Sequence, residues 1–160
     1  MMRVLEREQW LPIPMEKAWD FFSTPLNLGK ITPDDMRFSI RQPFTNVPVH
    51  EGQRISYTVR PLFNIPLRWE TCIAIVEPPH RFVDVQVKGP YRHWWHEHRF
   101  MAQDGGTLMR DRVEYELPFG MLGDFLHAPL VRKRLNAIFD FRRSALERLF
   151  PARASNASLA

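Results

Sequence analysis

Residues 93–118, HWWHEHRFMAQDGGTLMRDRVEYELP, decide the fold. Two runs in this stretch, 93–102 and 108–117, are rich in aromatic and β-branched residues, and the intervening Asp104-Gly105-Gly106 favours a tight turn. Strands joined by so short a connection pair in antiparallel fashion. The stretch therefore predicts a long β-hairpin.

Each strand of this hairpin has one mainly charged face and one face that mixes apolar and polar side chains. Alternate residues of a strand share a face. The two mixed faces consist of Trp94, His96, His98 and Phe100 on the first strand, and of Met109, Asp111, Val113, Tyr115 and Leu117 on the second. We expect both sets to point to the concave side of a curved sheet.

That orientation depends on the length of the turn. A two-residue turn at Gly105-Gly106, or a four-residue turn, places both mixed sets on one face, whereas a three-residue turn places Arg99 opposite Asp111. We predict the two-residue turn, because the three-residue turn moves aromatic residues to the charged face. Its cost is two pairs of like charges across the hairpin, Arg99 with Arg112 and Glu97 with Glu114.

The rest of the chain supplies a strand, two short helices, more strands and a long helix. The first strand spans 4–11; a helix with Pro14 in its first turn ends at Pro25, and a second covers 26–31. Four further strands are predicted at 36–41, 53–60, 67–76 and 82–88. An amphipathic helix is predicted from about Pro129 to Phe150, after a loop at 119–124 and before a disordered tail at 151–160.

Composition places these elements in one domain, residues 1–150. The chain has 160 residues, of which 44% are apolar, including 12 Phe and 5 Trp, so it can build a core and still line a cavity with aromatic rings. It contains no apolar stretch of bilayer length and no secretory leader, and its single cysteine, Cys72, cannot form an internal disulfide. We expect a cytoplasmic protein without a membrane span.

The net charge of +4 is modest, and the basic residues near the C-terminus, Arg132, Lys133, Arg134, Arg142, Arg143 and Arg148, are interpreted as a solvated helix face. We therefore predict no nucleic-acid partner. The sequence leaves a homodimer open.

The order of elements and a set of motif residues resemble the SRPBCC superfamily, also called START-like or helix-grip proteins, and within it the bacterial ligand-binding and polyketide cyclase/dehydrase-like members. The resemblance rests on Pro14, Ala18-Trp19-Asp20-Phe21-Phe22, Pro66, Trp69, Thr71, Pro78-Pro79, Phe82, Asp84, Gln86, Gly89-Pro90, Trp94, His96, His98, Phe100, Gly105-Gly106-Thr107, Asp111, Val113, Tyr115 and Pro118. It implies an α+β fold in which a seven-stranded curved antiparallel sheet wraps the C-terminal helix around a ligand cavity. It does not imply a particular reaction.

The resemblance also decides one orientation. Pattern alone would bury Val83, Val85 and Val87, but the resemblance points Asp84 and Gln86 into the cavity. The expected ligand-binding set is then Trp69, Thr71, Ile73, Asp84, Gln86, Trp94, His96, His98, Phe100, Asp111, Val113, Tyr115 and Phe139.

Three interpretations of His96 and His98 stay open. The imidazoles can be structural, each paired with Asp84, Asp111 or water; they can orient the polar end of a ligand; or they can bind a metal or transfer protons. A metal site needs at least three ligands and only two can be placed from sequence, so we predict no metal and no cofactor.

Two functions follow from these observations. The first is a binding module for a small hydrophobic or aromatic molecule. The second is a cyclase or dehydratase in which His96 or His98 works with Asp84 or Asp111 as acid and base. Signatures of nucleotide, hydrolase and zinc-ribbon sites are missing. Residues 119–126, which carry two glycines, can gate the pocket or pack statically over the helix end.

Overall fold

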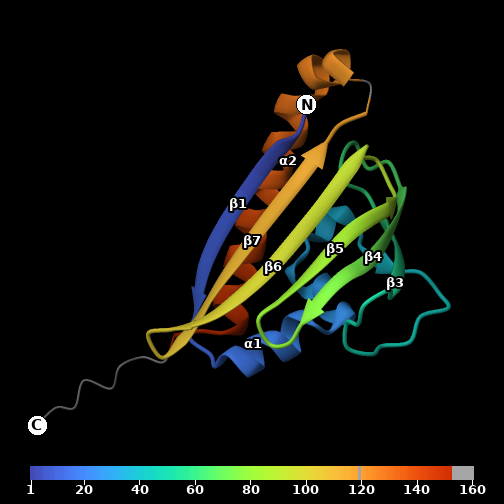
Figure 1. The fold of residues 1–160 in the computed structure, drawn as a ribbon. Helices are drawn as coiled ribbons and strands as arrows, with labels where there is room; N and C mark the ends of the chain where they lie inside the picture. The colour runs from blue at the N-terminus through green and yellow to red at the C-terminus, as the bar shows by residue number, and fades with distance from the viewer. Residues whose placement is uncertain (119, 153–160) are drawn as a thin grey trace, which may run out of the picture.

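The computed structural model describes residues 1–118 and 120–152, and for residues 120–128 it describes the backbone alone. Phe119 and the predicted tail from residue 153 onward lie outside the described residues. The strands form one antiparallel sheet in the order β1-β7-β6-β5-β4-β3-β2, which curves around the helices (Figure 1). This is the predicted α+β architecture with seven strands. Among the described residues, no helix combines the length and apolar character needed to cross a bilayer.

The elements follow the predicted order with small shifts at their ends. They are β1 Arg3–Leu11, α1 Met15–Phe22, the 3-10 helices η1 Pro25–Ile31 and η2 Asp34–Met36, β2 Ser39–Ile40, β3 Arg54–Val59, β4 Leu67–Glu77, β5 Arg81–Lys88, β6 His93–Gln103, β7 Gly106–Glu116 and α2 Gly120–Leu149. Of the strand predicted at 36–41, only Ser39–Ile40 pairs, because Met36 ends η2 and Arg37 adopts a left-handed conformation with φ 44°. A left-handed residue cannot continue a pleated strand.

The β6–β7 turn has the predicted length but a different position. Gln103 pairs with Gly106, so the two turn residues are Asp104 and Gly105 rather than Gly105-Gly106. Both have positive φ, 51° and 74°, which is the pattern of a type I′ hairpin turn. The register moves by two residues, so every side chain keeps its predicted face.

The change in register replaces one predicted pair of like charges. Glu97 lies opposite Arg112, not opposite Glu114, while Arg99 still faces an arginine, Arg110. The cross-strand partner of His98 is Asp111. The turn at Asp104-Gly105 is therefore better matched electrostatically than the one predicted, and it brings two polar residues of the concave face side by side.

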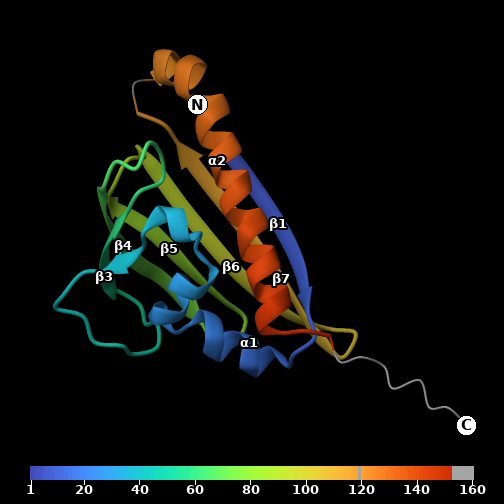
Figure 2. The ribbon, with the colours of Figure 1, turned by 180° about the vertical axis from the view of Figure 1, so that it is seen from behind.

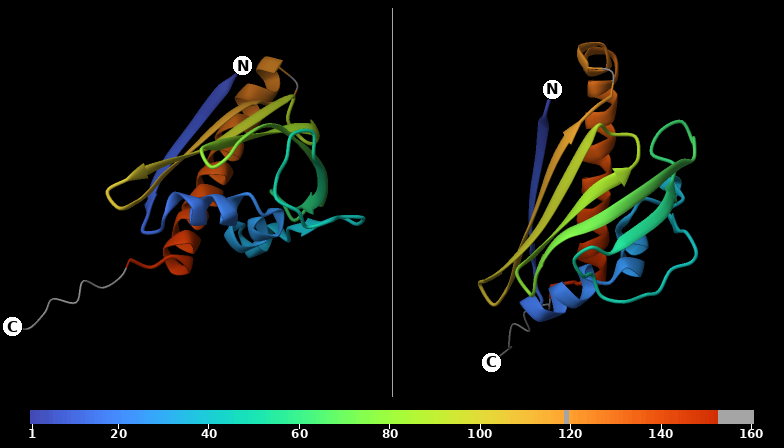
Figure 3. Two further views of the ribbon diagram at one scale, coloured as in Figure 1. Left: turned by 60° about the horizontal axis from the view of Figure 1, so that its bottom comes forward. Right: turned by 45° about the vertical axis from the view of Figure 1, so that its right-hand side comes forward.

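Helix α2 runs along the concave side of the sheet, with α1, η1 and η2 beside it (Figures 2 and 3). It begins at Gly120, not near Pro129, so the loop predicted at 119–124 is wrong from residue 120 onward. A proline usually marks a helix start because it lacks an N–H, yet Pro129 lies inside α2. The gate predicted at 119–126 concerns side chains that are outside the described part of the chain.

Two apolar clusters fill the space between sheet and helices. One lies around Phe100, Met109 and Leu146, and the other around Val113, Tyr115 and Phe139. On β6 and β7 the residues between these clusters are polar. The core is thus interrupted by a polar layer in the middle of the concave face.

Candidate functional site

A cavity of about 190 Å³ lies between the concave face, α2 and the short helices. Its wall is mostly apolar. Aromatic rings form one side of it: Trp69 and Trp94 meet edge to face at 5.1 Å between ring centroids, Tyr57 stacks on Trp69 at 6.1 Å, and Tyr91 lies 4.9 Å from Trp94. Such rings give an apolar ligand broad, rigid contact surfaces.

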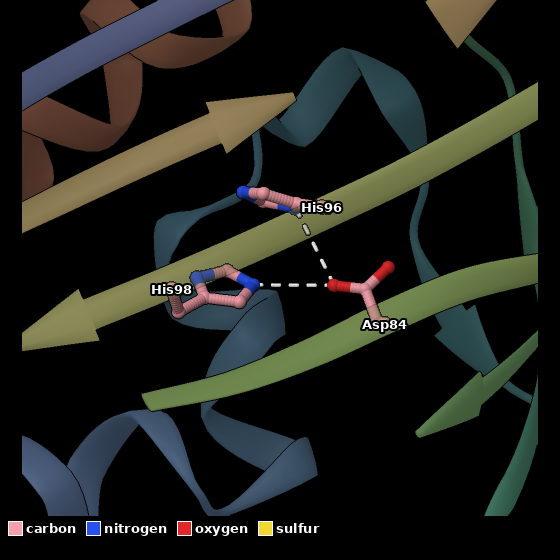
Figure 4. Close-up of side chains that lie close together, drawn as sticks. All are labelled: Asp84, His96 and His98. Carbon is pink, nitrogen blue, oxygen red and sulfur yellow. Dashed lines mark hydrogen bonds and ion pairs between the residues drawn. The ribbon is translucent and has the colours of Figure 1, made fainter. Parts of the chain in front are cut away.

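The wall also contains a group of titratable side chains, to which β5 contributes Asp84 and β6 contributes His96 and His98. Asp84 is the cross-strand partner of His96, and His98 is two residues further along the same face. Figure 4 shows both imidazoles turned toward the Asp84 carboxylate. The Asp84 Oδ2 atom is 3.2 Å from His98 Nε2, a hydrogen bond, and 3.4 Å from His96 Nδ1, a contact that becomes an ion pair when His96 is protonated.

The other nitrogen of each imidazole faces a second carboxylate, Asp111 on β7. His96 Nε2 is hydrogen bonded to Asp111 Oδ1 at 3.0 Å, so with a proton on Nε2 the imidazole donates. His98 Nδ1 is 2.9 Å from the same oxygen, but the two atoms are not aligned for a hydrogen bond. Each histidine therefore bridges two aspartates, one in the cavity wall and one behind it.

Arg142 of α2 completes the group. Its Nη1 lies 3.6 Å from Asp111 Oδ1 and its guanidinium packs over the ring of Phe139 at 4.8 Å. The side chain lines the cavity and is only 8% exposed, yet its Nε and Nη1 have no hydrogen-bond partner among the described residues. Buried donors of this kind normally have partners, so two donor nitrogens of this cavity-lining arginine are left without one.

The protonation preferences of the two histidines differ. Burial lowers the pKa of His96, and the neighbouring His98 acts in the same direction. Burial also opposes a charge on His98, but the carboxylates of Asp111 and Asp84 outweigh it and raise the pKa of His98. In the absence of any other cation, the site favours a proton on His98 over one on His96.

Both aspartates stay ionised in spite of burial. Burial acts to raise the pKa of Asp84, but the two histidines hold it below the ordinary value for an aspartate. Burial acts on Asp111 in the same way, and His96, His98 and Arg142 together hold the pKa of Asp111 far below its usual range. The cluster thus contains two carboxylates at neutral pH.

The structure brings together part of the predicted ligand-binding set. The residues of that set in the cavity wall are Trp69, Thr71, Ile73, Asp84, Trp94, His96, His98 and Phe139. The other members lie elsewhere: Phe100, Val113 and Tyr115 are in the core, Asp111 lies behind the histidines, and Gln86 bonds the backbone of Tyr91. Gln86 is occupied because its amide closes the turn between β5 and β6.

Sequence reasoning missed much of the wall, and three of the missed residues matter for its aromatic and charged parts. Tyr57 and Tyr91 were not predicted, although both sit among the aromatic residues of the wall, and Tyr57 hydrogen bonds Thr71 at 2.9 Å. Arg142 was interpreted as part of a solvated basic face. Its spacing from Leu135 and Phe139 follows the apolar face of α2, and this helical period was the signal available in the sequence.

A second, outer groove adjoins the cavity. It measures about 320 Å³ and lies between α2 and the β3–β4 loop. The two spaces share Pro61, Tyr91, Leu135 and Ile138. Because these residues border both spaces, the groove is the part of the described surface from which a ligand would enter the cavity.

Comparison with known proteins gives matches of structure only. No family model matches the sequence, and no curated protein matches it. Among solved structures, ginseng major latex-like protein 151 from Panax ginseng aligns over 94% of this chain and 98% of its own, with TM-score 0.69 and 10% identity. Protein CV1439 from Chromobacterium violaceum aligns over 92% and 96%, with TM-score 0.69 and 11% identity. Ara h 8.0201 aligns over 92% and 99%, with TM-score 0.62 and 16% identity.

These matches cover nearly the whole chain on both sides, and their low identity makes them informative about the fold alone. The TM-scores of 0.62 to 0.69 over almost the full length show that the overall arrangement of the chain is shared with these structures. This chain therefore shares the fold of these structures, which is the helix-grip fold that the sequence resemblance implied.

Proposed function

We propose that this protein binds a small molecule with an apolar, preferably aromatic body and one anionic oxygen group, held in the cavity under the concave face. The observation that carries the proposal is the buried Arg142, which lines a mostly apolar cavity and has two donor nitrogens without a partner among the described residues. Ligand sites usually combine an apolar lining with a few convergent polar groups.

The cavity limits the size of the ligand body. An apolar protein cavity of roughly 150 Å³ takes up benzene, so about 190 Å³ suits one or two fused rings. A longer ligand has the outer groove available beyond Tyr91 and Leu135. Trp69 offers a further polar contact, because its indole Nε1 is buried without a hydrogen-bond partner among the described residues.

The polar end of the ligand is expected beside Arg142 and the histidines. A guanidinium binds a carboxylate through two parallel N–H bonds, and a charged partner roughly doubles the strength of each bond. Asp111 compensates part of the arginine charge from one side only, at 3.6 Å. An anionic oxygen from the ligand would occupy the donors that Asp111 leaves unused.

A matched pair of probes tests this function. Calorimetric titration compares 2-naphthoate with 2-methylnaphthalene, which differ in the carboxylate. We expect both to bind and the carboxylate to bind at least tenfold more tightly. Arg142→Met should abolish that preference and leave hydrocarbon binding intact, because methionine keeps the apolar contact with Phe139.

The adjacent Arg143 provides the control. Arg143 is exposed and donates to the backbone oxygen of Glu8, so Arg143→Met should leave both affinities unchanged. A third variant, Ile73→Trp, fills the cavity and should remove binding of both probes. Failure of both probes to bind the wild-type protein, or equal binding to the Ile73→Trp variant, would contradict the proposal.

Acid–base catalysis of the cyclase or dehydratase type is the second candidate, and the hydrogen-bonded His98–Asp84 pair in the cavity wall favours it. Such reactions begin when a base removes a proton from the carbon next to a carbonyl. The ionised Asp84 in the cavity wall can accept the proton with His98 as its hydrogen-bond partner, while Arg142 stabilises the enolate oxygen. Exchange of α-protons of 2-acetylnaphthalene for solvent deuterium, followed by NMR, measures this step; rates that survive His98→Gln and Arg142→Met would exclude these roles.

A further inference from the structure

The two histidines and two aspartates offer more nitrogen–carboxylate contacts than the imidazoles have protons. All four ring nitrogens of His96 and His98 lie 2.9–3.4 Å from a carboxylate oxygen. A neutral imidazole has one N–H, so two neutral rings supply two donors for four contacts. With a second proton on His98 alone the rings supply three donors for the four contacts, and charging both rings would place two cations with ring centroids 3.9 Å apart. The arrangement lacks positive charge between the histidines and Asp84.

The atoms around this uncompensated position, one each from Asp84, His96 and His98, are placed as metal ligands would be. His96, His98 and Asp84 each present one ligand atom, and the three atoms all lie within 4.8 Å of one another. The Asp84 Oδ2 atom is 3.4 Å from His96 Nδ1 and 3.2 Å from His98 Nε2. Ligands of a tetrahedral zinc ion, with bonds of about 2.0–2.1 Å, are separated by about 3.3 Å. Two of the three separations already have this value.

The surroundings of these ligands also match a metal site. Histidines that bind a metal usually donate their other N–H to a carboxylate, which fixes the tautomer and the ring orientation. Asp111 accepts this hydrogen bond from His96 Nε2 at 3.0 Å, and the same oxygen lies 2.9 Å from His98 Nδ1, where a small rotation of the ring would align the two atoms. Arg142 in turn lies 3.6 Å from Asp111. The cluster thus has an inner layer of Asp84, His96 and His98 at the cavity and an outer layer of Asp111 and Arg142 behind them.

The charge of the cluster suits a divalent ion that also binds an anion. With neutral imidazoles, the carboxylates of Asp84 and Asp111 exceed the single guanidinium by one negative charge. A divalent ion reverses that excess to one positive charge, and an anionic oxygen neutralises it. Because all three ligand residues line the cavity, a coordination position is left open toward the space where a ligand would lie.

We infer that Asp84, His96 and His98 form a binding site for a divalent transition-metal ion such as zinc or iron(II), with Asp111 and Arg142 holding the histidines in place. Two histidines and one carboxylate with open positions are a ligand set that both ions accept. Binding places the metal on His96 Nδ1, His98 Nε2 and Asp84 Oδ2, and any proton on those nitrogens passes to solvent. The third ligand, Asp84, is what the sequence alone could not supply.

The test uses metal ions without any organic ligand, so its failure leaves the proposed ligand binding standing. Protein stripped with a chelator is titrated with Zn²⁺ by calorimetry and with Co²⁺ by visible absorption. We expect one ion per chain. Asp84→Asn and His96→Gln, which preserve side-chain size, should each weaken Zn²⁺ binding at least tenfold, and Asp111→Asn should weaken it roughly 10–100-fold.

His93 supplies the matched control, since it lies on the same strand as His96 and His98 but on the opposite face. His93→Ala should retain wild-type affinity for both ions and the same cobalt spectrum. Circular dichroism of each variant checks that the fold is intact. No stoichiometric uptake by the wild-type protein, or uptake that Asp84→Asn and His96→Gln leave unchanged, would overturn the inference.

Discussion

The sheet carries a charged cluster on each face, and the two clusters pair their charges differently. The convex cluster comes from β4, β5 and β6, and the concave cluster from β5, β6, β7 and α2. On the convex face Arg81 binds both carboxylate oxygens of Glu77, at 2.7 and 2.9 Å, and reaches Glu97 at 2.9 Å. Arg99 binds the same Glu97 oxygen at 2.9 Å. Each acidic group there has an arginine partner whose charge does not depend on pH.

On the concave face the acidic groups share histidines, and the only arginine has unpaired donors among the described residues. Burial makes each unmet contact there more costly than the same contact on the surface. In the convex cluster each acidic group is hydrogen bonded to an arginine, whereas the concave cluster keeps unpaired donors that an additional partner could bind. That difference, rather than the number of charges, distinguishes the candidate site from a structural ion-pair network.

The largest expected effect comes from removing one partner of the concave cluster. Asp111→Ala leaves Arg142 and the two histidines without the carboxylate that they share. Breaking a buried charged network in this way costs about 3–5 kcal/mol. Urea denaturation should show a loss of this size in the free energy of unfolding.

A second substitution separates charge from packing. In Asp111→Ala/Arg142→Met the uncompensated guanidinium is gone, so part of the lost stability should return. If the loss in the free energy of unfolding of the double variant equals the sum of the losses of the two single variants, the interaction between Asp111 and Arg142 contributes nothing to stability.

An intermediate effect of opposite sign is expected when the whole concave cluster is made apolar. Replacing a buried ionic network by apolar side chains of similar volume is often neutral or stabilising by about 1–4 kcal/mol. We expect this gain for the five-residue variant Asp84→Leu, His96→Leu, His98→Leu, Asp111→Leu and Arg142→Met. Thermal and urea unfolding measure it, together with loss of 2-naphthoate and Zn²⁺ binding. A large loss of stability would instead assign the cluster a structural role.

The order of elements was predictable because the hairpin at 93–118 and the punctuation by proline and glycine are local signals. The face of each hairpin residue was predictable too. The turn was predicted at Gly105-Gly106 and lies at Asp104-Gly105. Both turns have two residues, so every side chain stays on its predicted face of the sheet. The exact partners were not predictable, since they require the register itself.

The composition of the site needed information that no local pattern contains. Asp84 reaches the histidines through β5–β6 pairing, and its own strand pattern favours burial of the valines. Arg142 was misinterpreted because residue type argued for solvent while helical spacing argued for the core. The start of α2 was predicted wrongly for a similar reason. Proline prefers the first turn of a helix, but Pro129 lies inside α2, which begins at Gly120.

The smallest effect is expected on the convex face. Arg81→Met removes two hydrogen bonds to Glu77 and one to Glu97, but Arg99 still binds Glu97, and the solvent near Glu77 can hydrate the carboxylate. The Arg81–Glu77 pair is partly exposed, and exposed ion pairs are weak and are screened by salt. Glu97 is only 8% exposed, but it keeps Arg99 as its partner. The urea midpoint should shift far less than for Asp111→Ala, and the shift should shrink further in 1 M NaCl. A large, salt-independent loss would mean that the convex cluster is as tightly coupled as the concave one, and the distinction between the two faces would fail.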